Sequence, residues 1–343
     1  MKSGVRLGYL ASALIFGAFS WAPEGLAQSS FFEGKAIRII VGFSAGGGYD
    51  VYSRTLARHM GKHIPGNPAI SVENMTGAGS MIAANHVYKA AKPDGLTIGH
   101  FIGGLFLQQL LGRPGLEFDA LKFEYIGVPG QDNFVFFVAK STGISDVEKW
   151  IASKTVLKFG GVASGSGTND LPNVLRVTLG LPIQLVSGYK GTADIRLALN
   201  SGEVQGLSNS WESTKSTWRK ELDSEDIVVI LQANTKSHPE LTHVPVAYNL
   251  AKNEEAQKLI ATVVRVHGPS VRPYVLPPGT PKDRVQILRK AFMDTMKDPE
   301  FLAEAKKANL DINPADGAEL ERNVKEIFKL EPGLIAKLKE ILK

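Results

Sequence analysis

The chain has 343 residues, of which 43% are hydrophobic, and a formal net charge of +5 from 39 basic and 34 acidic side chains. This mild balance, with its basic residues scattered and no basic stripe between aromatic residues, argues against nucleic acid as a partner. The chain contains no cysteine, which excludes a disulfide framework and thiolate metal sites, so its stability must come from a large buried core.

The N-terminus predicts a secretory signal peptide. A positive start (Lys2 and Arg6) precedes an apolar stretch, residues 7–22, and a small-x-small cleavage site at residues 25–27. A permanent membrane anchor is the alternative, but the apolar stretch is short for a span of roughly 20 residues. We therefore expect an exported protein whose mature chain begins near Gln28.

Apolar runs typical of strands alternate with helical patterns along the rest of the chain. The predicted strands cover residues 36–42, 96–101, 134–140, 156–162, 183–189 and 226–232. An amphipathic helix is expected over 50–61, and a capping-box sequence, Ser145 to Glu148, opens another. The last third is mostly helical, beginning at Thr280-Pro281. The alternation predicts an α/β fold with largely parallel sheets.

A Gly-rich turn follows the first predicted strand and raises the question of chemistry at Ser44. Residues 42–46, Gly-Phe-Ser-Ala-Gly, match the G-x-S-x-G elbow of α/β hydrolases, in which the serine is the nucleophile. The position after the first strand argues against this interpretation, because hydrolase nucleophiles come later in the sheet. Neither a P-loop nor a dinucleotide-binding glycine spacing is present.

A second turn of similar composition follows the strand predicted at 156–162. It reads Ala-Ser-Gly-Ser-Gly-Thr-Asn-Asp over residues 163–170, and a helix is expected from about Asp170. Both turns join the carboxyl end of a strand to a helix N-terminus, where parallel sheets bind ligands and where partial positive charge suits a carboxylate. We expect the two turns to hold a small acid between them, unless both are ordinary tight turns with N-caps.

Two further features have simpler interpretations. Asp50 is most simply an N-cap of the helix that follows it. His59 and His63 have the i, i+4 spacing of metal ligands, but no Glu follows His59 and no third ligand is evident nearby. Packing at a helix end is therefore favoured over metal binding.

Motifs along the chain resemble those of the receptors of tripartite tricarboxylate transporters, the TctC or Bug family of periplasmic binding proteins. The matching segments are Gly42–Asp50, Asn74–Gly79, residues 92–99 (KPDGLTIG), 189–191 (YKG), 199–206 (LNSGEVQG), 277–281 (PPGTP) and 298–301 (DPEF). Each motif is weak alone, but their order and spacing over three hundred residues make the resemblance strong.

The resemblance implies a type II-like periplasmic binding protein, with mixed, mostly parallel sheets in two lobes and a ligand cleft between them. The implied division is a signal peptide at 1–27, a first lobe of 28–130 plus 229–343, and a second lobe of 131–228. It also implies a periplasmic monomer with no catalytic residues, no cofactor and no metal. Its partners would be a small carboxylate ligand and the membrane subunits of a transporter.

The residues that the resemblance assigns to ligand binding lie in the two turns and in two later segments. They are Ser44, Ala45, Gly46, Gly47, Gly48 and Asp50; Ser164, Gly165, Ser166, Gly167, Thr168 and Asn169; and Tyr189, Ser208 and Asn209.

The sequence departs from the family pattern where specificity should be set. Gly42 and Thr76 replace prolines, residues 169–172 (Asn-Asp-Leu-Pro) replace a His-Leu, and Asn209 replaces an Asp. The particular acid is therefore left open, with citrate only one candidate. A secreted serine hydrolase using Ser44 is the alternative function, and a sensor with a partner kinase is a third possibility.

Overall fold

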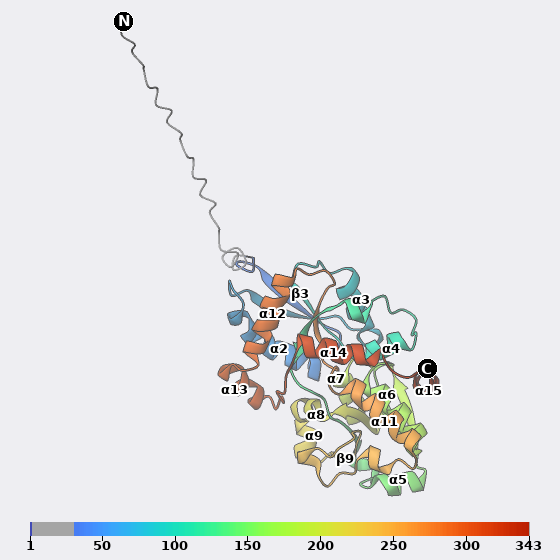
Figure 1. The fold of residues 1–343 in the computed structure, drawn as a ribbon. Coiled ribbons are helices and arrows are strands. Elements are labelled where there is room, and N and C mark those ends of the chain that lie inside the picture. Colours follow the sequence, from blue (N-terminus) through green and yellow to red (C-terminus); the bar gives the residue numbers. More distant parts are fainter. Residues whose placement is uncertain (2–30, 343) are drawn as a thin grey trace.

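The computed structural model describes residue 1 and residues 31–342. The predicted signal peptide, apart from its first residue, lies outside the described residues. No helix in the described part of the chain combines the length and the apolar character that a membrane crossing requires. The described residues form two sheets with helices packed around each of them (Figure 1).

The first sheet has six strands in the order β11-β4-β10-β3-β1-β2. Its strands are β1 (Ala36–Val41), β2 (Ala69–Asn74), β3 (Thr97–His100), β4 (Glu124–Val128), β10 (Tyr274–Leu276) and β11 (Ala315–Asp316). The helices on this side are α2 (Gly48–Met60), α3 (Met81–Lys89), α4 (Gly104–Leu110), α12 (Lys282–Thr295), α13 (Pro299–Lys307) and α14 (Gly317–Ile327). Strand β1 pairs in parallel with β2 and β3, whereas β10 runs antiparallel to both of its neighbours.

The second sheet has five strands in the order β7-β6-β8-β5-β9. Its strands are β5 (Phe134–Ala139), β6 (Leu157–Gly161), β7 (Ile183–Ser187), β8 (Gly206–Ser210) and β9 (Ile227–Gln232). Its helices are α5 (Val147–Ser153), α6 (Gly167–Leu179), α7 (Thr192–Asn200), α8 (Trp211–Thr217), α9 (Arg219–Asp223), α10 (Ala247–Leu250) and α11 (Glu254–His267), and the C-terminal helix α15 (Pro332–Ile341) returns to contact α6.

Two short segments carry the chain between the sheets. The first, residues 129–133, leads from β4 into β5, and the second, residues 268–273, leads from α11 into β10. The two crossing segments touch, because the backbone N–H of Asp132 donates to the carbonyl of Gly268 at 3.2 Å. Each crossing brings a strand antiparallel into the next sheet, which is why antiparallel pairing is more frequent than the sequence predicted.

The predicted α/β fold with two mixed sheets is confirmed, and all six predicted strands are present. Five strands were not predicted: β2, β4, β8, β10 and β11. Strand β8 reads Gly-Leu-Ser-Asn-Ser, and every residue in it is buried between β6 and β5. Its strand conformation is therefore imposed by its neighbours in the sheet, since its polar residues have little strand propensity of their own.

The predicted helix starts need small corrections. Helix α5 is capped by Asp146, whose carboxylate accepts the N–H groups of Glu148 and Lys149, so the predicted capping box at Ser145 is wrong. Helix α6 begins at Gly167, before the predicted start at Asp170. The predicted lobe boundaries remain a prediction. If the lobes are divided by the sheet to which each strand belongs, the chain returns to the first lobe at residues 268–273 and not at residue 228. The reason is that β9 pairs with β5 and α11 packs on α6, which places both in the second lobe.

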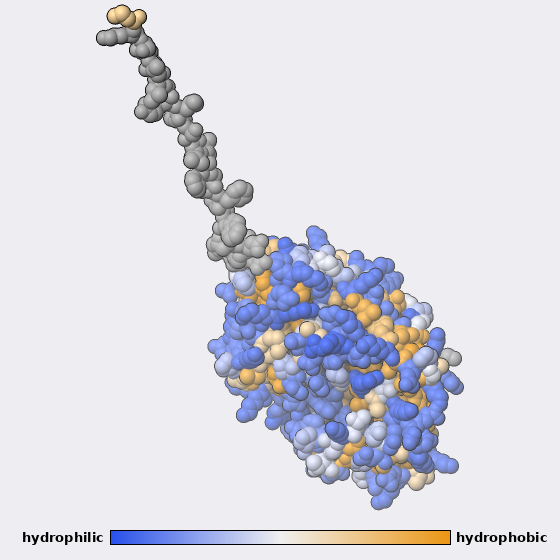
Figure 2. All heavy atoms as spheres, in the orientation of Figure 1, coloured by the Kyte–Doolittle hydropathy of each residue, from blue (hydrophilic) through white to orange (hydrophobic). Residues whose placement is uncertain are grey.

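The core is apolar and lies around both sheets, as a chain without cysteine requires. Its largest fully buried side chains include Trp150, Trp218 and several phenylalanines. Figure 2 shows a largely hydrophilic face on which apolar residues are scattered. The fold thus places the carboxyl ends of β1 and β6, and the helices that follow them, around the junction of the two sheets.

Candidate ligand-binding site

A narrow cavity lies where the two sheets meet, next to the crossing segments. It is lined by Phe43, Gly47, Gly48, Tyr49, Ile102, Asp132, Phe134, Val162, Ser166, Gly167, Thr168, Thr192, Asn209, Ser210, Ser213, Val271 and Arg272. The cavity offers a volume of about 40 Å³ to the centres of water-sized groups, which is room for a few such groups. Any ligand that fits this cavity as it stands is small.

The N-terminus of α2 forms one wall of the cavity. The loop 42–47 after β1 turns at Gly46, whose φ of +77° suits glycine, and the helix begins at Gly48. The first N–H groups of a helix have no partner within it, so the helix end at Gly48 presents donors and partial positive charge to the cavity.

Asp50 holds this first loop in place from behind. Its carboxylate accepts the N–H of Gly46 at 2.9 Å, Nε of Arg54 at 2.9 Å and Nδ2 of Asn74 at 3.0 Å. Burial alone would raise the pKa of Asp50, but these hydrogen bonds outweigh it and the pKa lies below its ordinary value. The prediction that Asp50 is the N-cap is wrong, because Gly47 occupies that position without a side-chain cap.

The N-terminus of α6 forms the opposite wall and repeats the design. Here the loop turns at Gly165, with φ of +91°, and the helix begins at Gly167. Asp170 accepts the N–H of Gly165 at 2.9 Å, and its other oxygen bonds to His267 Nε2 at 3.2 Å and Gln108 Nε2 at 3.4 Å. Because Gln108 lies on α4, next to the first sheet, the second loop is held partly from across the junction.

Arg272 is the charged group that sequence reasoning missed. It lies on the second crossing segment, is 1% exposed, and donates from Nε to Asp132 at 2.7 Å. Its Nη2 donates to Ser213 at 2.6 Å and to Ser210 at 3.0 Å. The guanidinium carbon lies 4.7 Å from the ring centre of Tyr49 and 4.8 Å from that of Tyr52, so two aromatic rings also hold it.

Burial shifts the ionisable groups around this pair. It raises the pKa of Glu212 to about 8, with the negative charge of Asp132 adding to the effect, while hydrogen bonds from Asn133 oppose it. Burial also raises the pKa of Asp132, partly offset by Arg272. The pKa of His100 falls to about 3 through burial, so this ring, stacked on Tyr274, is neutral at physiological pH.

Six of the predicted binding residues line the cavity: Gly47, Gly48, Ser166, Gly167, Thr168 and Asn209. The others lie outside its lining: Ser44, Ala45, Gly46, Asp50, Ser164, Gly165, Asn169, Tyr189 and Ser208. Most of these shape the loops instead. Ala45 and Gly46 are exposed, Asn169 donates to Ser187 at 2.8 Å, and the hydroxyl of Tyr189 donates to Glu203 at 2.6 Å.

The surroundings of Ser44 do not favour a nucleophile. Its hydroxyl is buried without a hydrogen-bond partner among the described residues, so no histidine is positioned there to take its proton. Three residues separate it from the start of α2, whereas an elbow serine lies at the strand-to-helix turn itself. Its backbone N–H donates to the carbonyl of Lys190 at 3.3 Å, which joins the first loop to the segment after β7.

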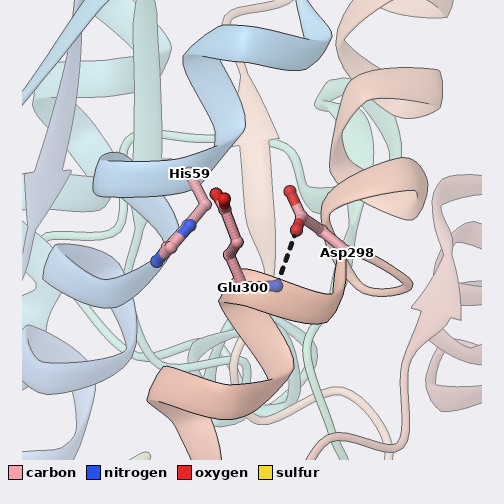
Figure 3. A group of neighbouring side chains, drawn as sticks. All are labelled: His59, Asp298 and Glu300. Carbon is pink, nitrogen blue, oxygen red and sulfur yellow. Dashed lines mark hydrogen bonds between the residues drawn. The ribbon is translucent and has the colours of Figure 1, made fainter.

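His59 near the end of α2 and His63 in the 3-10 turn that follows it lie outside the cavity lining and face α13. Figure 3 shows His59 beside Asp298 and Glu300, and the nearest ligand atoms of the three lie within 4.8 Å of one another. Asp298 and Glu300 come from the start of α13, so the sequence could not show that they approach His59.

These carboxylates already face cations of the chain. Lys62 Nζ lies 2.5 Å from Asp298 and 2.6 Å from Glu300. His63 bonds to Asp298 at 2.8 Å, and His59 bonds to Glu304 at 2.7 Å. The arrangement therefore favours an ion-paired seam between two helices, as the interpretation of helix-end packing expects.

Comparison with known proteins identifies the family. Residues 52–339 match the model of the tripartite tricarboxylate transporter family receptor, TctC. The chain belongs to this family. A Cupriavidus necator relative, the UPF0065 protein in the gbd 5′ region, is 24% identical over 338 residues, which cover 97% of this chain and 96% of the relative.

Solved structures share the fold of this receptor. The periplasmic binding protein BugD superposes with a TM-score of 0.72 at 21% identity, covering 90% of this chain and 98% of BugD. MatC from Rhodopseudomonas palustris, solved with bound malate, superposes with a TM-score of 0.70 at 20% identity, covering 91% of this chain and 100% of MatC. An R. palustris protein solved with adipate superposes with a TM-score of 0.71 at 21% identity, covering 90% of this chain and 98% of that protein. The predicted two-lobed binding-protein fold is thus confirmed.

Proposed function

We propose that this receptor captures a small organic acid between its two lobes outside the cytoplasm and delivers it to a tripartite tricarboxylate-type membrane transporter. The observation that carries the proposal is the pair of helix N-termini, at Gly48 and Gly167, which line one cavity from two sheets. Two such ends suit an anion, because each adds unpaired N–H donors and partial positive charge.

The comparisons with known proteins also support a receptor for a small organic acid. The family is one of transporter receptors, and two proteins of the same fold were solved with malate and with adipate, both carboxylates. The predicted cleavable signal peptide supports export, and we propose the periplasm as the location and a monomer as the working form. The cavity residues of the two loops, with Asn209, are the proposed ligand contacts.

A thermal-shift screen of the purified protein against mono-, di- and tricarboxylates tests the binding step. A ligand at about 100 times its Kd adds roughly 2.7 kcal/mol, which is several degrees in the melting temperature. If no acid raises the melting temperature while Ser44→Ala abolishes hydrolysis of a simple ester by the protein, the receptor proposal fails and the hydrolase alternative replaces it.

Delivery needs a separate test, since a sensor would bind the same acid. Crosslinking of the acid-loaded receptor in its native membranes, followed by identification of the captured chains, should recover transporter subunits. Capture of a membrane kinase in their place would contradict delivery and support sensing.

A further inference from the structure

One donor in the cavity has no partner within the described part of the protein. Arg272 Nη1 is buried and makes no hydrogen bond, although Nε and Nη2 of the same guanidinium are fully engaged. It lies at the start of α2, where a Cβ on Gly48 would come within 3.3 Å of it. A buried charged N–H without an acceptor is costly, and an acid oxygen placed there would remove that cost.

The charges around the cavity leave room for one negative charge. Among the lining residues only Asp132 and Arg272 are charged, and they neutralise each other. The two helix N-termini add about half a positive charge each. Glu212, whose carboxylate accepts two hydrogen bonds from Asn133, has its pKa raised to about 8 by burial and by the charge of Asp132, so it does not bring a full negative charge at neutral pH. The site is therefore balanced by a single carboxylate.

The remaining polar side chains of the lining are largely occupied. Ser166 donates to Ala163, Thr168 accepts the N–H of Val162, and Asn209 donates to Thr214. Thr192 adds one hydroxyl at the start of α7, which suits a hydroxyl or carbonyl group of a ligand but not a whole carboxylate.

The rest of the wall is apolar, formed by Phe43, Tyr49, Ile102, Phe134, Val162 and Val271. A second carboxylate against these side chains would lose its water without gaining hydrogen-bond partners, which is strongly unfavourable. An apolar body there would gain from burial instead.

We propose that the ligand is a small monocarboxylic acid with an apolar body, whose carboxylate is held by Arg272 Nη1 between the two helix N-termini. This inference rests on the proposed function and narrows its ligand class. It sets this receptor apart from the two proteins solved with the dicarboxylates malate and adipate.

Calorimetric titration with matched acids tests the charge count. Butanoate and succinate share a four-carbon skeleton and differ in one carboxylate, as propanoate and malonate do with three carbons; butanamide supplies a neutral control. We expect each monoacid to bind at least about tenfold more tightly than its diacid, and butanamide not to bind. Equal or tighter binding of the diacids would overturn the inference and leave the proposed function standing. Failure of every acid would instead count against the proposed function.

The variant Arg272→Lys tests the anchor. Lysine keeps a positive charge beside Asp132 but lacks the fork that leaves one donor free for the ligand. We expect at least about a thirtyfold loss of affinity for the monoacid, while Lys297→Gln, an exposed lysine outside the cavity lining, leaves affinity unchanged. Unchanged affinity of Arg272→Lys for the monoacid would overturn the proposal that Arg272 holds the carboxylate of the ligand. If that variant does not fold, the double variant Asp132→Asn/Arg272→Gln, which removes both charges together, takes its place with the same expected loss.

Discussion

The two loops that meet at the cavity have one plan and two kinds of support. In each, a glycine with positive φ precedes a 13-residue helix, and a buried aspartate accepts the N–H of that glycine at 2.9 Å. Asp50 is held by Asn74 and by Arg54, whose side chain is 43% exposed. Asp170 is held by His267 and Gln108, both buried, and Gln108 lies next to the other sheet.

This difference separates local from distant support. The carboxylate of Asp50 bonds to Gly46, Arg54 and Asn74, which all belong to the first sheet, to α2 or to the loop between them. The first loop crosses the junction elsewhere, through the bond from the Ser44 N–H to Lys190. The carboxylate of Asp170 itself bonds across the junction, to Gln108 on α4. We infer that separation of the lobes would disturb the support of Asp170 more than that of Asp50.

The largest expected effect is on stability, and it compares the two aspartates directly. Asp170→Ala leaves the Gly165 N–H, His267 and Gln108 buried without their shared acceptor, at a cost of about 3–5 kcal/mol. Asp50→Ala should cost only about 1–3 kcal/mol, because Arg54 can turn to water. Urea denaturation of both variants measures this. Equal losses would mean that the two supports are equivalent and would remove the distinction.

The next effect is on binding and compares adjacent glycines of the first loop. A Cβ on Gly48 would lie 2.0 Å from Ser213 Oγ, which Arg272 needs as a partner, so Gly48→Ala should weaken acid binding by about tenfold or more. A Cβ on Gly47 meets nothing closer than 3.4 Å, so Gly47→Ala should stay within about threefold of the wild type by calorimetry. A larger loss in Gly47→Ala than in Gly48→Ala would show that the loop approaches the ligand differently.

The smallest effect concerns acid stability of the first loop. Because the pKa of Asp50 is lower in the folded protein than in the unfolded chain, its carboxylate stabilises the fold above the unfolded pKa. That contribution is lost as the pH falls through the folded pKa. Between about pH 5 and pH 3, the wild type should therefore lose more stability than Asp50→Asn, by about 1 kcal/mol at most. Parallel losses in melting temperature for the two proteins would contradict this.

Sequence patterns predicted those parts that depend on local chemistry. Apolar runs identified β1 and β6, and the Gly-rich turns located both helix N-termini of the site to within three residues. Strand β8 was missed because its polar residues become a strand only between β6 and β5. Patterns along the chain carry no information on such long-range pairing.

The cavity residues from distant segments were missed for the same reason. Asp132 and Arg272 are 140 positions apart and pair only because the two crossing segments touch. One signal was present: an arginine between Val271 and Pro273, within a mostly apolar stretch from 271 to 278, is unusual enough to suggest a buried partner. The binding residues named from the resemblance alone include many that shape the loops without lining the cavity. The reason is that a family motif contains residues that set the backbone conformation of a loop as well as residues that contact the ligand.

The position of Arg272 on a crossing segment has a mechanical consequence. If the lobes separate, the segments 129–133 and 268–273 must bend, and groups near a bending axis travel least. Arg272 and Asp132 both lie there, whereas the starts of α2 and α6 lie on opposite lobes and would move apart. The guanidinium would then be the charged group of the cleft that moves least. An arriving acid could dock on it first, and the two helix ends would close over an anion already in place.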